Sequence, residues 1–235
     1  MINPFCWLRF QRTRRAIADY PLYEPPNKGA EGSLRLNKIE ENFAYFMAVR
    51  LERLSFFRRW LSDRFGVEAP LNGEGVLALE KWADRYSGGL IADGDNGGEV
   101  FRTYRPDWTG ERCGYNVLVD VAIFLGEYLI SKRPQLHWTL LRDVNGTCVD
   151  EKEESRGFTL GRPDLGGYAI YYSVGLFASV YFKALGSSYW LQFGGNRHHR
   201  IHMSFAWACR ASHDVADHKD PRATFTFGNY SDGPL

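Results

Sequence analysis

The chain has 235 residues, of which 44% are hydrophobic, 15% aromatic and 24% charged, with a formal net charge of +1. This length allows one domain to bury a sizeable core without a disulfide or a structural metal. The near-neutral charge gives no electrostatic reason to expect a nucleic-acid partner.

The cysteines indicate a reduced compartment, because Cys6, Cys113, Cys148 and Cys209 are far apart and form no Cys-x-x-Cys pair. The N-terminus lacks the continuous apolar core of a secretion signal, so we expect a cytoplasmic protein. The apolar stretch 168–185 contains serines, a glycine and tyrosines and is barely long enough to cross a bilayer. We expect it to be a buried helix or two strands, and we expect no membrane partner.

Residues 1–37 are predicted to form a basic and aromatic N-terminal arm. Four arginines lie among aromatic residues, and loop signals at Pro21, Pro25, Pro26 and Gly29 follow. An arm packed on the body explains this pattern most simply. The arm could also bind RNA or an anionic membrane, but the four clustered arginines, Arg9, Arg12, Arg14 and Arg15, lack a wider basic field.

Two helices are predicted next. Apolar residues recur at helical spacing from Asn37 to Gly66, and the stripe that they form is Phe43, Met47, Leu51, Leu54, Leu61 and Phe65, widened by Phe46, Phe56 and Phe57. Arg50, Arg53 and Arg64 lie away from this stripe, which predicts a solvated basic back. Asn72 can cap a second helix that ends near Gly88, so the two helices are expected to form a hairpin.

The strongest helical pattern runs from Tyr115 to Lys132. Its apolar face is Leu118, Val121, Ala122, Leu125, Tyr128 and Leu129. The opposite face carries a polar stripe of Asn116, Asp120, Glu127 and Ser131, which is either solvated or lines a site. A solvated stripe is the better explanation, although Asp120 and Glu127 also have roughly the separation of a glycosidase carboxylate pair. After Pro134 the pattern predicts a strand over 136–141.

Two loops gather acidic residues. Asp93, Asp95 and Glu99 lie in a glycine-rich loop, where a calcium-binding hand is excluded because the twelfth position is Tyr104. The second loop carries Asp150, Glu151, Glu153 and Glu154. Acidic loops can steer a basic partner toward a binding surface, so these seven residues are the predicted partner-binding residues.

A histidine cluster lies near the C-terminus. If residues 200–215 are helical, His202, Cys209 and His213 share one face and could present two imidazoles and a thiolate to zinc. The glutamate of a His-Glu-x-x-His helix is missing, and no nucleophile elbow, phosphate-binding loop or dinucleotide motif is present. We therefore expect no cofactor and a protein that is not an enzyme, with zinc at these three residues as the alternative.

A resemblance adds to this interpretation. The motifs at 42–46, 59–61, 82–83 and 116–120, with Gly126-Glu127 and Pro134-x-x-x-Trp138, resemble a class of uncharacterised bacterial proteins that pair an aspartate-bearing helix with a downstream tryptophan strand. The resemblance covers residues 40–142. Small cytoplasmic α/β proteins of this kind are similar in type and size to immunity proteins of polymorphic toxins, which bind and block a toxin.

Together the patterns predict an α+β, helix-rich fold, in which an N-terminal helical hairpin and a central helix pack on a small, mostly antiparallel sheet. After the arm, residues 38–220 are expected to form one globular domain and residues 221–235 a C-terminal tail. The expected function is that of a non-enzymatic, immunity-type protein that neutralises a toxin by direct binding, with a cognate toxin domain as partner. The alternative is a zinc-dependent hydrolase, and the sequence leaves the oligomeric state open.

Overall fold

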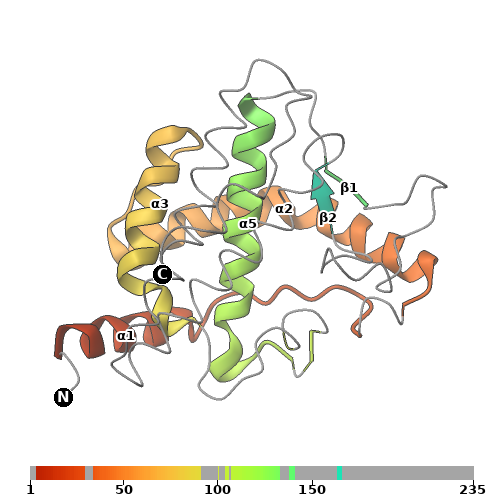
Figure 1. The fold of residues 1–235 in the computed structure, drawn as a ribbon. Helices are drawn as coiled ribbons and strands as arrows, with labels where there is room; N and C mark the ends of the chain where they lie inside the picture. Colours follow the sequence, from red (N-terminus) through yellow and green to blue (C-terminus); the bar gives the residue numbers. More distant parts are fainter. Residues whose placement is uncertain are drawn as a thin grey trace, which may run out of the picture.

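The computed structural model describes residues 4–29, 34–90, 100, 104–105, 107–132, 138–140 and 163–165. The elements that it places in these ranges are α1 (Pro4–Ile17), α2 (Leu36–Phe65), α3 (Gly73–Tyr86), the 3-10 turns η2 (Ser87–Gly89) and η3 (Gly110–Arg112), α5 (Gly114–Lys132), β1 (Trp138–Leu140) and β2 (Pro163–Leu165). α5 crosses α2, and α1 and α3 lie to one side of this crossing (Figure 1).

The predicted α+β class is wrong for the described residues, which are mainly helical. Their strand pairing is limited to the three-residue segments β1 and β2, which run antiparallel with Trp138 opposite Leu165. A pair of this length has no face broad enough for two helices to pack on. The described core is instead built from helices, because α2 packs on α5 and α3 packs on α1.

The long helix predicted to end at Gly66 is confirmed as α2. Gly66 has a φ of 68° and its N–H donates to the Ser62 carbonyl, while the next N–H, of Val67, donates to the Leu61 carbonyl. These two hydrogen bonds close the helix at a residue in the left-handed conformation, which glycine adopts without strain. Most of the predicted stripe is buried or partly buried, and Phe46 and Phe57, which were predicted to widen it, are fully buried. Leu51 departs from the prediction, since it is 52% exposed.

The second predicted helix is confirmed as α3, together with its cap. The Asn72 side chain accepts a hydrogen bond from the Gly75 N–H at 3.1 Å, which satisfies one of the free amides of the first turn. Val76, Leu79 and Trp82 lie on its buried side, as predicted. Trp82 contacts Phe57, Trp60 and Phe65 of α2 edge to face, and these rings join the two helices.

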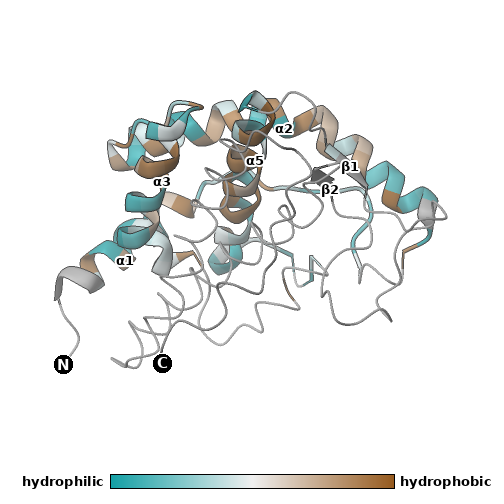
Figure 2. Cartoon of the chain, turned by 45° about the horizontal axis from the view of Figure 1, so that its top comes forward, coloured by the Kyte–Doolittle hydropathy of each residue, from teal (hydrophilic) through white to brown (hydrophobic). Residues whose placement is uncertain are grey.

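The central helix is confirmed as α5, and every residue of its predicted apolar face is buried. It is hydrophobic along most of its length (Figure 2). The segment Gly110–Lys132 is long and apolar enough to cross a membrane, but 89% of its most apolar window is buried inside the protein. An apolar helix that is buried inside the protein is typical of a hydrophobic core.

The predicted N-terminal arm contains α1 and the segment that follows it. Ala16, Ile17, Tyr20 and Tyr23 belong to the same hydrophobic cluster as the buried residues of α2, α3 and α5. The Trp60 indole N–H also donates to the Ala16 carbonyl at 2.9 Å. The boundaries proposed at 37, 220 and 221 stay predictions, because most of residues 141–235 lie outside the described residues.

Candidate functional site

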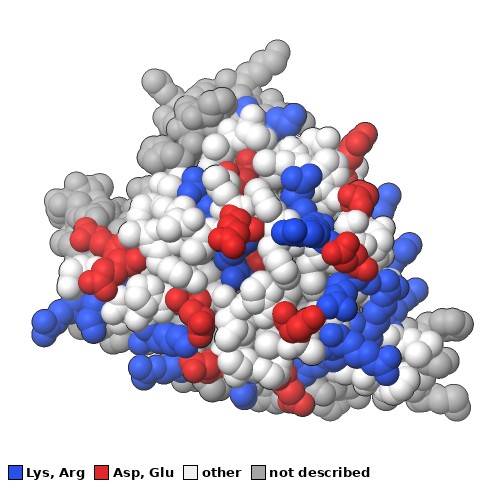
Figure 3. Space-filling model, turned by 180° about the vertical axis from the view of Figure 1, so that it is seen from behind, with Lys and Arg blue, Asp and Glu red and all other residues white. Residues whose placement is uncertain are grey.

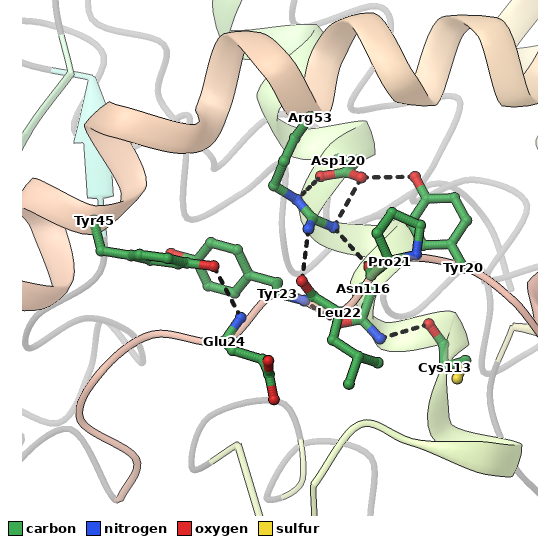
Figure 4. Close-up of polar contacts among 10 residues, drawn as sticks. All are labelled: Tyr20, Pro21, Leu22, Tyr23, Glu24, Tyr45, Arg53, Cys113, Asn116 and Asp120. Atoms are coloured by element: carbon green, nitrogen blue, oxygen red, sulfur yellow. Dashed lines mark hydrogen bonds and ion pairs between the residues drawn. The ribbon is translucent and has the colours of Figure 1, made fainter.

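A buried polar network holds the N-terminal strap, which we define as residues 20–28, against α2 and α5. The strap contains Pro21, Pro25 and Pro26, which lack an N–H and therefore cannot form a regular ladder. Side chains of the two helices bind its backbone groups instead (Figure 4).

Asp120 of α5 is the centre of this network. Its two carboxylate oxygens accept hydrogen bonds from Arg53 Nε at 2.6 Å and Arg53 Nη2 at 3.0 Å, and Oδ2 also accepts one from the Tyr20 hydroxyl at 2.6 Å. The Asp120 side chain is 0% exposed and that of Arg53 is 8% exposed. Two-point contact of this kind fixes the guanidinium plane as well as neutralising the charge.

Arg53 also binds the strap directly. Its Nη1 donates to the Leu22 carbonyl at 3.0 Å and its Nη2 to the Pro21 carbonyl at 3.3 Å. Its guanidinium lies over the Tyr23 ring, 5.5 Å from the ring centroid. Arg53 therefore links the carboxylate on α5 to the backbone of the strap.

The titration behaviour of these groups follows from burial and from their mutual contacts. Burial raises the pKa of Asp120 to about 6, although the charge and hydrogen bonds of Arg53 and the hydrogen bond from Tyr20 act to lower it. Burial, followed by the nearby Asp120 charge, raises the pKa of Tyr20. Burial alone would lower the pKa of Arg53, but the charge and hydrogen bonds of Asp120 raise it overall.

Two asparagines bind further along the strap. Asn116 Oδ1 accepts a hydrogen bond from the Tyr23 N–H at 2.7 Å, and Asn116 Nδ2 donates to the Trp108 and Cys113 carbonyls. Asn42 pairs with the backbone of Asn27 in both directions, at 2.9 Å each. Since an amide side chain can donate and accept, it satisfies an extended backbone that has no neighbouring strand.

A second ion pair lies farther along α5. Glu127 Oε1 accepts hydrogen bonds from Arg50 Nε at 3.0 Å and from the Trp138 indole N–H at 2.8 Å. The Trp138 ring also meets Phe46 edge to face, with ring centroids 4.9 Å apart. Glu127 thus connects α5 to both α2 and β1.

The structure corrects two predictions about charged faces. The first half of the polar stripe of α5 is not solvated, because Asn116 and Asp120 are fully buried beneath the strap and α2, whereas Glu127 is partly buried and Ser131 is exposed. The back of α2 is not uniformly solvated either, because Arg53 is buried and Arg50 is only 21% exposed in its side chain. An aspartate within an otherwise apolar helix is the sequence signal for a buried partner, since buried acids are almost always paired.

Burial limits the chemistry that this network can perform. A carboxylate next to a tyrosine hydroxyl could exchange a proton, but a general base must reach a substrate, and Asp120 is fully buried. The two carboxylates compared above with a glycosidase pair are likewise paired with arginines, Asp120 with Arg53 and Glu127 with Arg50. The described arrangement stabilises the strap rather than presenting reactive groups.

All ten predicted site residues lie outside the described residues. These are the partner-binding residues Asp93, Asp95, Glu99, Asp150, Glu151, Glu153 and Glu154, and the zinc candidates His202, Cys209 and His213. Among the residues that the structure describes, no group of three or more His, Cys, Asp or Glu side chains could hold a metal ion. The acidic loops and the histidine cluster therefore stay predictions.

No protein-family model, curated protein or solved structure matches this chain. Its function is therefore argued from the contacts described above and from its sequence.

Proposed function

We propose that this chain is a non-enzymatic binding protein that neutralises a bacterial toxin by direct contact. The observation that carries the proposal is that the two acids of α5 are each paired with an arginine. Asp120 and Glu127 are the candidates for acid–base chemistry on α5, and each is bound to an arginine of α2. Acids paired in this way stabilise the helical scaffold, so we expect the functional contacts to lie at the surface.

The proposed contact surface is the pair of acidic loops identified in the sequence. Like charges concentrated in two loops contribute little to folding, but they attract a basic partner and raise its association rate. Toxins that cut nucleic acids need a basic surface to bind phosphates. An acidic inhibitor would therefore compete with the substrate for the same surface of the toxin.

The test begins with the neighbouring gene, which the proposal predicts to encode a toxin domain. That domain is then titrated with this chain. We expect the two proteins to bind in a defined ratio by calorimetry and the chain to restore growth of cells that express the toxin. Serine substitution of the second acidic loop should slow association at low salt, with a smaller effect at high salt. The substituted residues are Asp150, Glu151, Glu153 and Glu154.

A matched control removes the same number of exposed acids elsewhere. The control substitutions are Glu52→Gln, Asp63→Asn, Glu74→Gln and Glu111→Gln, at exposed positions on α2, α3 and η3. If the control slows association as much as the loop variant, the attraction is general and the loops are not the docking site. Failure to bind or neutralise the toxin would contradict the proposed function itself.

A further inference from the structure

We propose that the outer end of α1 docks on a membrane surface that carries anionic phospholipids. The docking face, which we call the α1 face, consists of Trp7, Leu8 and Arg15, which lie within about 100° of one another around the helix axis, and of Arg9 at its edge, about 100° beyond Leu8. The proposal is independent of toxin binding, because it concerns where the chain is held rather than what it neutralises.

α1 is strongly basic although the whole chain is nearly neutral. The helix carries four arginines and no aspartate or glutamate. Two of them anchor the helix to the body. Arg12 donates to the Arg64 carbonyl at 2.6 Å and lies over the Phe65 and Tyr86 rings, and Arg14 donates to the Glu111 carbonyl at 2.5 Å.

The other two arginines have no such role. Arg9 and Arg15 are exposed, and their side chains form no hydrogen bond or ion pair with the described part of the chain. Beside them, Trp7 is 51% exposed and Leu8 56% exposed. Single exposed apolar side chains are ordinary, but tryptophan and leucine next to unpaired cations are the composition of helices that lie in a membrane interface.

The helix is held rigidly in position to present this face. A Cβ at Gly89 would lie 2.6 Å from the Thr13 Cβ, so α1 and η2 are in close contact. The Thr13 hydroxyl donates to the Tyr86 carbonyl at 2.8 Å. α1 lies at the edge of the described helices and extends beyond α3 (Figure 1). A flat bilayer could therefore reach the α1 face.

The end of α2 lies next to α1, because Arg12 reaches the carbonyl of Arg64. Arg64 is itself paired with Asp19 at 2.6 Å, so this pair neither adds to nor removes from the net charge of the α1 face. Seen from behind, Lys and Arg side chains gather at the lower right of the molecule, a smaller group lies at the lower left, and Asp and Glu side chains lie among them (Figure 3). Each basic residue near an anionic leaflet adds to binding, and salt screens this attraction.

The apolar residues decide between lipid and other anionic partners. A nucleic acid would bind the arginines through its phosphates, and a base can stack on a tryptophan, but Leu8 gains little from a phosphate backbone. A phospholipid surface binds both kinds of side chain, because its headgroups attract the cations and the acyl boundary accepts Trp7 and Leu8. The proposed docking differs from the sequence-based expectation of no membrane partner, because within the described residues Arg12 and Arg14 hold α1 to the body while Arg9 and Arg15 are exposed.

The experiment is co-sedimentation of the full-length chain with vesicles. The probes are vesicles of phosphatidylcholine alone and of phosphatidylcholine mixed with phosphatidylglycerol. We expect binding to the mixed vesicles only. Substituting Trp7→Ser and Leu8→Ser together should weaken it on the order of tenfold, and Arg9→Gln with Arg15→Gln about fivefold per arginine.

Matched controls carry the same changes elsewhere. Leu51→Ser with Leu77→Ser removes two leucines that are 52% and 48% exposed, and Arg35→Gln with Lys38→Gln removes two exposed cations at the far end of α2. These variants should bind as the parent does. The proposal is overturned if the mixed vesicles are not bound, or if the control pairs weaken binding as much as the α1 face pairs. It is also overturned if only the arginines matter and a short RNA competes, since that result assigns the face to nucleic acid.

Discussion

Asp120 carries a carboxylate into the interior of the protein, where Arg53 and Tyr20 supply three hydrogen bonds to it. A buried charge without such partners costs several kcal/mol, so the three side chains depend on one another. They come from the strap, α2 and α5, and Arg53 and Asp120 are 67 positions apart in the sequence. The network is therefore a tertiary contact that forms only when the three segments are assembled.

Replacing Asp120 should be more damaging than replacing the other paired acid of α5. Asp120→Asn replaces an acceptor oxygen with an amide N–H that faces the donors of Arg53 and Tyr20, so at pH 3.8, below the Asp120 pKa of about 6, we expect a loss of about 1–3 kcal/mol in the free energy of unfolding. Glu127→Gln, at a side chain that is 12% exposed, should cost about 1 kcal/mol. Urea denaturation of both variants measures the difference. Equal losses would mean that the Asp120 pair has no special role.

The raised pKa of Asp120 predicts how stability depends on pH. The folded protein holds the Asp120 proton more tightly than the unfolded chain does, because its pKa rises from 3.8 to about 6 on folding. This group's contribution to the free energy of unfolding is therefore fully present below pH 3.8 and is lost as the pH rises through about 6. Relative to Asp120→Asn, the parent should lose stability across this window and then level off. Urea midpoints at a series of pH values provide the check, and a constant difference between the two proteins would contradict it.

At the scale of elements, α5 and β1 meet through a glycine. A Cβ at Gly126 would lie 2.2 Å from Cζ2 of Trp138, so only glycine lets the indole ring lie against the helix. The ring is then positioned for its N–H to donate to Glu127. Gly126 and Glu127 are thus in direct contact with Trp138. These residues are among the motifs that carry the resemblance noted in the sequence.

Gly126→Ala should destabilise the protein by about 1–3 kcal/mol, because overpacking outweighs the better helix propensity of alanine. The partner variant is Trp138→Phe, whose smaller ring lacks the atoms that approach Gly126. In the double variant, the cost of Gly126→Ala should largely disappear. A double-mutant cycle from thermal unfolding measures this coupling, and additive effects of the two substitutions would show that the close contact does not exist.

The sequence predicted individual helices well and their surroundings poorly. Helical spacing, the Asn72 cap and the Gly66 terminus depend on neighbouring residues, and α2 and α3 follow them closely. Periodicity showed that Asn116 and Asp120 share a face of α5, but it could not show what covers that face. The strap covers it, and the prolines of the strap indicate only an irregular segment. The sheet was predicted from short apolar runs, which are equally compatible with other structures.

At the scale of the whole molecule, the described helices form a scaffold whose charged interior is closed. Arg53 and Arg50 of α2 neutralise the two acids of α5, and the strap is bound over the first of these pairs. Functional contacts are then expected at the surface, through the acidic loops and the α1 face. None of these surface roles could be predicted from the buried network itself, because packing and partner recognition use different residues.

The measurement that tests this account most directly is toxin neutralisation by the double variant Arg53→Gln, Asp120→Asn. The amides keep hydrogen-bond donors and acceptors in the network but remove both charges and any acid–base capacity. We expect the double variant to fold, to be more stable than Asp120→Asn alone, and to protect toxin-expressing cells as well as the parent chain does. A double variant that unfolds cooperatively like the parent but no longer protects cells would contradict a purely structural role for the network and would indicate that Asp120 takes part in chemistry.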